Sequence, residues 1–213
     1  MALEKYKKLI ERIVEQKGVD AIPKLIELLE DEQQEVREIA LESIYALGDK
    51  ARKPLLEIFR SRLKERRKKD ILLLYLIDVL SNFGERSIKQ HLYEIMDRYN
   101  TEQELLVIYE ALAKLGDGEK FVDILGYFLT EDDYKEELAD QAVMALAHIS
   151  SDSSLRYLVK GYKDPQLGRE TKENIIQAIA MIIAKEPQLY RFLSDEEEIV
   201  KKLKEFTSPA HQS

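Results

Sequence analysis

The chain of 213 residues contains no cysteine and no tryptophan, and it has only 8 glycines and 5 prolines. Without cysteine, the protein can form no disulfide, no thiolate metal site and no cysteine nucleophile. All-β proteins join many strands with turns that use glycine and proline. The scarcity of both residues therefore argues against that class.

Long apolar runs are also missing. The longest covers residues 71–77, well short of the roughly 18 residues that a membrane span needs. The charged first residues are not followed by an apolar stretch, so we expect no signal peptide and a cytoplasmic location. The abundance of lysine and glutamate is typical of thermophile surfaces.

The formal charge is −8 and is unevenly distributed. Between Arg60 and Asp70 there are seven basic and two acidic residues, a local charge of +5, so the remainder carries −8 − 5 = −13. An acidic surface repels phosphate backbones, which disfavours nucleic acid as a partner except at that basic run.

A repeat of 32 to 36 residues is the strongest positive signal. Similar segments end at Gly48, Gly84, Gly116, Ser150 and Ala184, in steps of 36, 32, 34 and 34 residues. The residues twelve, eight, four and one before each end are apolar, except Glu104 and Lys172. This spacing places them on one face of a helix, and the glycines predict left-handed helix ends.

A shorter amphipathic segment precedes each of these helices, so each repeat is predicted to be a helical hairpin. One hairpin cannot bury its own apolar face, whereas stacked hairpins share a continuous core. We expect one domain over residues 1–206, with units at about 20–49, 50–85, 86–117, 118–151 and 152–185. Amphipathic helices at 2–17 and 195–206 would cap the ends, and residues 207–213 would be a disordered tail.

The first unit carries Leu28-Leu29-Glu30-Asp31, then Val36-Arg37, Ala40 and Leu47-Gly48-Asp49. This pattern resembles the bacterial HEAT-like repeats named after phycobilisome lyases. The resemblance implies a right-handed α-solenoid, an all-α superhelix, of about five hairpins. It also implies a contact between Asp31 and Arg37, and a binding scaffold rather than an enzyme.

The outward positions of the second helices are the main candidate binding site. In stacked hairpins these helices line the concave face, where partners bind. Half of the outward residues in the five units are acidic, which favours a basic protein or peptide segment. The candidates are Glu38, Glu42, Tyr45, Leu74, Asp78, Leu106, Tyr109, Glu110, Asp140 and Met144.

The basic run is the second candidate, as an anion-binding or nucleic-acid-binding site; ordinary solvated charge is the simpler interpretation. It comprises Arg60, Arg62, Lys64, Arg66, Arg67, Lys68 and Lys69. No aromatic residue is interleaved for base stacking.

Enzyme chemistry finds little support in the sequence. The three histidines, His91, His148 and His211, are far apart, and no phosphate-loop or nucleophile-elbow motif occurs. We therefore expect no metal, no cofactor and no catalytic residue. A lyase subunit or a HEAT-like DNA glycosylase stays open as a third alternative, and the sequence does not indicate the oligomeric state.

Overall fold

The structure is a computed structural model that describes residues 2–207. These residues form α-helices and 3-10 helices joined by short connections, with no strand among them. The all-α prediction is therefore confirmed. The last six residues of the predicted tail lie outside the described part, while Thr207 belongs to the final helix.

The structure divides into two compact units, the first ending at Asn100 and the second beginning at Thr101. The boundary separates the first and second helices of the predicted third hairpin. The first unit contains α1 (Ala2–Lys17), η1 (Gly18–Ala21), α2 (Ile22–Leu28), α3 (Gln34–Leu47), α4 (Asp49–Glu65), α5 (Ile71–Asn82), η2 (Arg86–Ile88), α6 (Lys89–Ile95) and η3 (Met96–Arg98).

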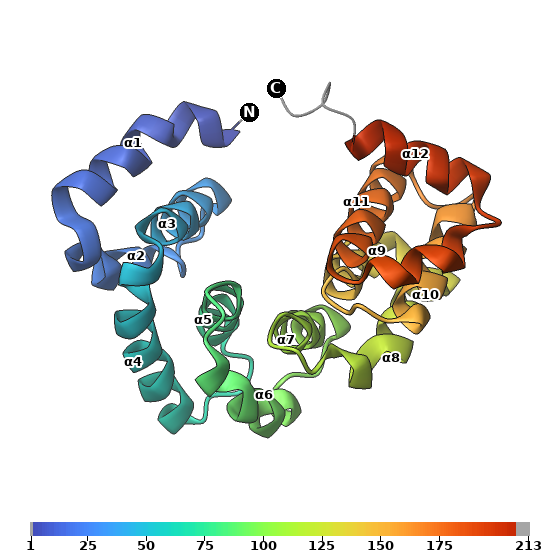
Figure 1. The fold of residues 1–213 in the computed structure, drawn as a ribbon. Helices are drawn as coiled ribbons and strands as arrows, with labels where there is room; N and C mark the ends of the chain where they lie inside the picture. Colours follow the sequence, from blue (N-terminus) through green and yellow to red (C-terminus); the bar gives the residue numbers. More distant parts are fainter. Residues whose placement is uncertain (1, 208–213) are drawn as a thin grey trace. The chain divides into compact units, whose positions relative to one another are not determined.

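Within the first unit, α1 packs on α3, and α2 contacts both α3 and α4 (Figure 1). Helix α4 in turn packs on α5. Ala40, Ile44 and Leu47 of α3 are buried as the repeat pattern predicts. Phe83 follows α5 and is half-buried, with its ring edge-on to Tyr45 at 6.1 Å.

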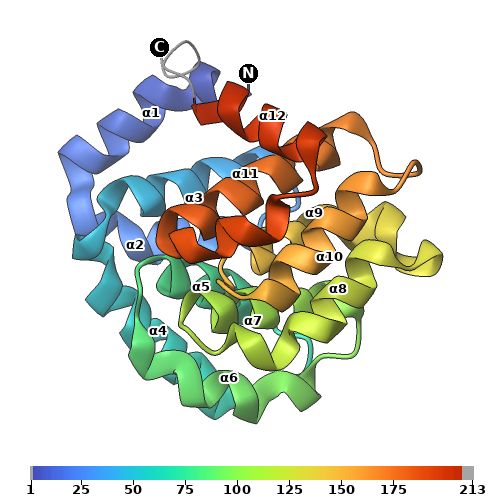
Figure 2. The same ribbon diagram turned by 45° about the vertical axis from the view of Figure 1, so that its right-hand side comes forward.

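The second unit contains α7 (Glu102–Lys114), η4 (Gly118–Phe121), α8 (Val122–Thr130), α9 (Asp132–Leu146), α10 (Asp152–Lys163), α11 (Arg169–Lys185), η5 (Pro187–Leu193) and α12 (Glu197–Thr207). Helices α7, α9 and α11 pack in one row, and α8 and α10 pack beside them in another (Figure 2). This is the side-by-side stacking of hairpins on which an α-solenoid depends.

Glycines close the predicted helix ends as expected. Gly48, Gly84 and Gly116 have φ of 59°, 67° and 89°, in the region that glycine enters without a steric penalty. The ends at Ser150 and Ala184 differ: α9 stops at Leu146, and α11 continues through Ala184 to Lys185.

The contact implied between Asp31 and Arg37 forms, but through a different acceptor. Nη1 of Arg37 donates to the backbone oxygens of Asp31 and Glu32 at 2.7 and 3.0 Å. The Asp31 carboxylate instead accepts from the backbone N–H of Gln33 at 2.9 Å. Arg37 therefore closes the α2–α3 turn as a hydrogen-bond donor to the backbone and not as half of an ion pair.

Candidate functional site

The predicted acidic residues of the first unit lie on α3 and α5. Asp78 accepts a hydrogen bond from the Tyr45 hydroxyl at 2.7 Å, and the Asn82 amide donates to both Tyr45 and Asp78 at 2.8 and 3.0 Å. Glu38 accepts from Gln34 at 2.7 Å. Glu42 forms no ion pair among the described residues, so its half-buried carboxylate is the one most available here.

Two apolar candidates do not point outward. Leu74 and Leu106 are buried, with 7% and 0% of their surface exposed, so the prediction that they lie at outward positions is wrong. Tyr109 is buried as well, and its ring stacks on Phe121 at 4.8 Å. Burial raises the pKa of the Tyr109 phenol. These three side chains stabilise the fold and offer little surface to a partner.

Other candidates in the second unit differ in their availability. Glu110 pairs with Lys114 at 2.8 Å, and little of either side chain is exposed. Asp140 is exposed and accepts from the Asn174 amide at 3.1 Å, which joins α9 to α11. Met144 is 47% exposed. Of the second-unit candidates, Asp140 and Met144 are therefore the ones that a partner could reach.

The repeat pattern of α11 is displaced by one residue from the prediction. Ile175, Ile179 and Ile182 are fully buried, whereas Ala180 and Ile183 are half-buried. The outward positions of this helix are consequently Glu173 and Gln177, and not Asn174 and Ala178, which the predicted phase would place outward.

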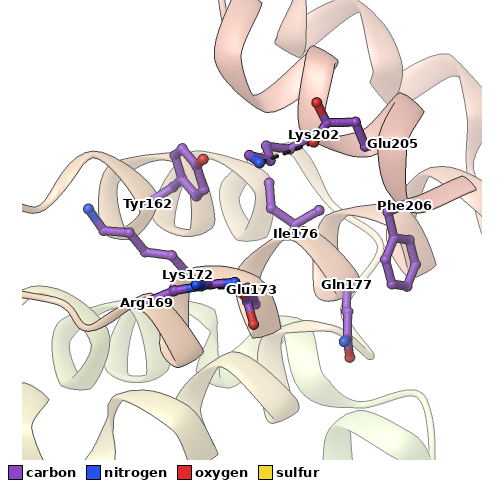
Figure 3. Close-up of a pocket in the computed structure, with 9 residues that line it drawn as sticks. All are labelled: Tyr162, Arg169, Lys172, Glu173, Ile176, Gln177, Lys202, Glu205 and Phe206. Carbon is purple, nitrogen blue, oxygen red and sulfur yellow. Dashed lines mark hydrogen bonds and ion pairs between the residues drawn. The ribbon is translucent and has the colours of Figure 1, made fainter. Parts of the chain in front are cut away.

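With this correction, the outward face of α11 lines a pocket of about 620 Å³. Five residues come from α11, one from α10 and three from α12 (Figure 3). They are Tyr162, Arg169, Lys172, Glu173, Ile176, Gln177, Lys202, Glu205 and Phe206. Pockets of this size, with an apolar lining and a few polar groups, are typical of ligand and peptide sites.

The floor of this pocket is apolar and its rim is charged. Ile176 is 5% exposed. Phe206 on α12 is 43% exposed, so much of its apolar surface remains in contact with water. Arg169 pairs with Glu173 at 2.7 Å across one turn of α11. Ile176 and Phe206 thus form an apolar site for a partner side chain, and the charges of Arg169 and Glu173 beside it neutralise each other.

The remaining rim charges also have neighbours. Lys202 pairs with Glu205 at 3.1 Å. Lys172 lies 5.9 Å from the centre of the Tyr162 ring and forms no ion pair among the described residues. The Tyr162 hydroxyl donates to Glu198 at 2.9 Å, and burial together with that carboxylate raises the pKa of the phenol.

A smaller pocket of about 160 Å³ lies on the second helices of the first unit. It is lined by Gln34, Arg37, Glu38 and Leu41 of α3 and by Tyr75 of α5. Glu38, a predicted site residue, is therefore part of a concave surface, although the volume accommodates little more than one side chain.

The basic run occupies the end of α4 and the turn before α5. Arg62 is the exception among its members because it is largely buried against Asp70, with Nη2 to Oδ1 at 2.6 Å. Arg67 pairs with Glu65 at 2.7 Å. The side chains of Arg60, Lys64, Arg66, Lys68 and Lys69 are exposed. The structure therefore removes Arg62 from the residues that could reach an external anion.

His148 follows α9 and is half-buried. Burial, with smaller contributions from the charges of Lys114 and Lys185, lowers the pKa of His148 to about 4. The imidazole is therefore neutral at pH 7. No group of three or more histidine, aspartate or glutamate side chains within residues 2–207 could hold a metal ion.

No described helix is long and apolar enough to cross a membrane. The profile of the HEAT repeat family matches residues 21–51, which cover the end of η1, α2, α3 and the start of α4. No curated protein and no solved structure matches the chain. Together with the helical hairpins, the HEAT match supports a HEAT-like repeat protein.

Proposed function

We propose that this HEAT-like repeat protein is a non-enzymatic scaffold that binds a segment of a partner protein on the outward face of its second helices. HEAT repeats commonly act as protein-interaction scaffolds. The single observation that carries the proposal is the pocket between α11 and α12, in which an exposed Phe206 stands beside the apolar floor at Ile176.

The pocket suits an apolar side chain projecting from a helix or an extended segment. Burial of the exposed part of the Phe206 ring against such a side chain would remove apolar surface from water. Aromatic residues in partly enclosed pockets are the usual anchors of protein interfaces. Arg169 and Lys202 each pair with a glutamate, so neither of them selects the charge of the partner. Lys172, which has no ion pair among the described residues, is the rim residue that favours a negative charge.

The preference for a basic segment rests on the acidic positions that keep their charge available. Glu42 forms no ion pair among the described residues, and Asp140 is contacted only by an amide. Each lies on a second helix of its own unit, so each carboxylate is considered within that unit alone. In the second unit, a lysine or arginine of the bound segment would complement Asp140.

A photo-crosslinking amino acid at Gln177, which is exposed in the pocket, tests the proposal. In an extract of the source cells, we expect a protein to be crosslinked at Gln177. The same crosslinker at Ile124, which is exposed on α8 in the other row, should not capture it. The purified partner should bind a Phe206→Ser variant at least about tenfold more weakly. Equal binding by that variant would refute the pocket as the binding site.

A further inference from the structure

We propose that the basic loop, defined as residues 64–71, is a second docking surface, which binds a short acidic segment of a partner protein carrying one apolar side chain. The loop lies within the first unit, from the end of α4 to the first residue of α5. It is separate from the pocket of the second unit, and its function does not depend on that pocket.

Four cations of the loop have no partner among residues 2–207. Lys64, Arg66, Lys68 and Lys69 are exposed, and their side chains form no ion pair or hydrogen bond. A cluster of exposed like charges raises the local energy of the folded chain unless counter-charges approach it. Elsewhere the chain carries an excess of acid, yet the fold brings no carboxylate to these four side chains.

Two of these cations occupy backbone conformations that disfavour them. Arg66 and Lys69 have φ of 50° and 53° and are the described non-glycine residues with positive φ. Side chains with a Cβ atom rarely adopt this region, whereas glycine enters it freely. The chain places glycine at four other positive-φ positions, so the use of arginine and lysine here retains charge at the expense of stability. Such strain is characteristic of functional segments.

The backbone of the loop is held at both ends. Asp70 accepts two hydrogen bonds from Arg62 and one from the backbone N–H of Leu73. The N–H of Lys69 donates to the carbonyl of Arg98 at 3.2 Å, and the Tyr99 hydroxyl donates to the carbonyl of Asp70 at 3.0 Å. The four cations therefore project from a fixed turn and not from a loose one.

The neighbouring Ile71 indicates which kind of anion fits. Ile71 is the first residue of α5 and is 53% exposed, the largest fraction among the exposed large apolar residues of the described chain. An apolar side chain contributes nothing to contacts with a phosphate backbone but can pack against an apolar residue of a peptide. Outside residues 60–70 the chain carries a net charge of −8 − 5 = −13, which repels a nucleic acid that extends beyond the loop more than it repels a short peptide.

A fluorescein-labelled ten-residue peptide, with four glutamates around a central leucine, is the probe for this surface. We expect anisotropy to report binding in 50 mM salt and a marked loss of binding in 200 mM salt. The double variant Lys64→Gln/Lys68→Gln should weaken binding about tenfold. The matched control Lys50→Gln/Lys53→Gln makes the same charge change at exposed positions near the start of α4, outside the loop, and should alter binding less than about twofold.

Two variants of one residue separate charge from backbone strain. Arg66→Gly removes both, so it should weaken peptide binding and raise the midpoint of thermal unfolding by about 2–4 °C. Arg66→Gln removes the charge alone and should weaken binding by the same factor without the gain in stability. Higher stability of the glycine variant with unchanged binding would mean that the loop is a solvated turn, and the proposal would fail.

The apolar contact is tested by a double-mutant cycle. Replacing the central leucine of the peptide by serine should weaken binding to the wild-type chain, and the same replacement should have little effect on Ile71→Ser. Competition by a ten-uridine oligonucleotide identifies the alternative ligand. If the oligonucleotide displaces the peptide at lower concentration and Ile71→Ser has no effect, the surface binds nucleic acid and the peptide assignment is overturned.

Discussion

Arg62 and Asp70 form a bidentate ion pair, in which Nε and Nη2 of the guanidinium donate to Oδ2 and Oδ1 of the carboxylate at 3.0 and 2.6 Å. Only 14% of the arginine side chain and 1% of the aspartate side chain are exposed. Oδ1 also accepts the backbone N–H of Leu73 at 3.2 Å, so the same carboxylate caps α5. The hydrogen bond with Asp70 raises the pKa of Arg62.

Asp70→Ala should lower the free energy of unfolding by about 3 kcal/mol, because it leaves the largely buried guanidinium of Arg62 with only the more distant carboxylate of Glu30, at 3.5 Å. Loss of the cap of α5 contributes about 1 kcal/mol of this. Ser151→Ala removes only a cap, that of α10, and should cost about 1 kcal/mol. Urea unfolding followed by circular dichroism measures both values. Equal losses would mean that the ion pair adds nothing to the capping.

The free energy of unfolding should decrease as the pH is lowered through a window set by the pKa of His148. Its pKa in the folded chain is about 4, below the value near 6.5 of an unfolded chain. The unfolded state therefore binds the proton first, and stability is lost as the pH falls from about 6.5 to 4, by at most about 3 kcal/mol. Above pH 7 the residue makes no contribution to the pH dependence.

His148→Gln is the control for this pH dependence. Between pH 6.5 and 5.5 most carboxylates remain ionised, so the variant should unfold at nearly the same urea concentration at both values, whereas the wild type should not. An NMR titration of the imidazole gives the pKa directly. A midpoint near 6.5 would contradict the assignment.

Helices α8 and α10 approach so closely at Gly126 that no side chain fits there. A Cβ atom on Gly126 would lie 2.3 Å from the Tyr157 ring. Gly126→Ala should therefore cost about 1–3 kcal/mol through overpacking. Gly168→Ala is the control, because nothing lies within 4 Å of its Cβ position, and it should change stability by less than 1 kcal/mol. Thermal unfolding of the two variants checks the contrast, and equal midpoints would contradict it.

Tyr45→Phe tests the hydrogen-bonded cluster on α3 and α5. The variant removes the hydroxyl that donates to Asp78 and accepts from Asn82, and it should cost about 1 kcal/mol. Tyr6→Phe removes an exposed hydrogen bond to Glu35 and should cost less. Urea unfolding compares the two. A larger loss in the Tyr6 variant would show that the cluster contributes little.

The hairpins could be predicted because burial of one helix face imposes a period on the sequence, and Leu115 and Ile149 are buried as expected. The phase of α11, meaning which of its residues face the core, could not be predicted. This helix carries apolar residues at positions 175, 176 and 178–184, so two of its faces are almost equally apolar. Only packing on α9, α10, η5 and α12 selects between them.

The pocket could not be predicted either, because it is formed by residues of three different helices. Its lining includes Tyr162 of a first helix and Phe206 of α12, and no local pattern indicates that these residues meet on the face of α11. The structural role of Arg62 was hidden as well. A run of basic residues resembles solvated surface, and the pairing with Asp70 depends on the chain reversing between α4 and α5. The role of Tyr45 in partner binding stays a prediction, and the structure shows its hydroxyl hydrogen-bonded to Asp78 and Asn82.

The anchoring of the turn before α5 by Arg62 and Tyr99 has a kinetic consequence. A turn that is already ordered loses little conformational entropy when another molecule settles on it, so no folding step would delay association. The rate of encounter would then depend mainly on diffusion and on ionic strength. Stopped-flow traces should show one phase whose rate rises linearly with ligand concentration.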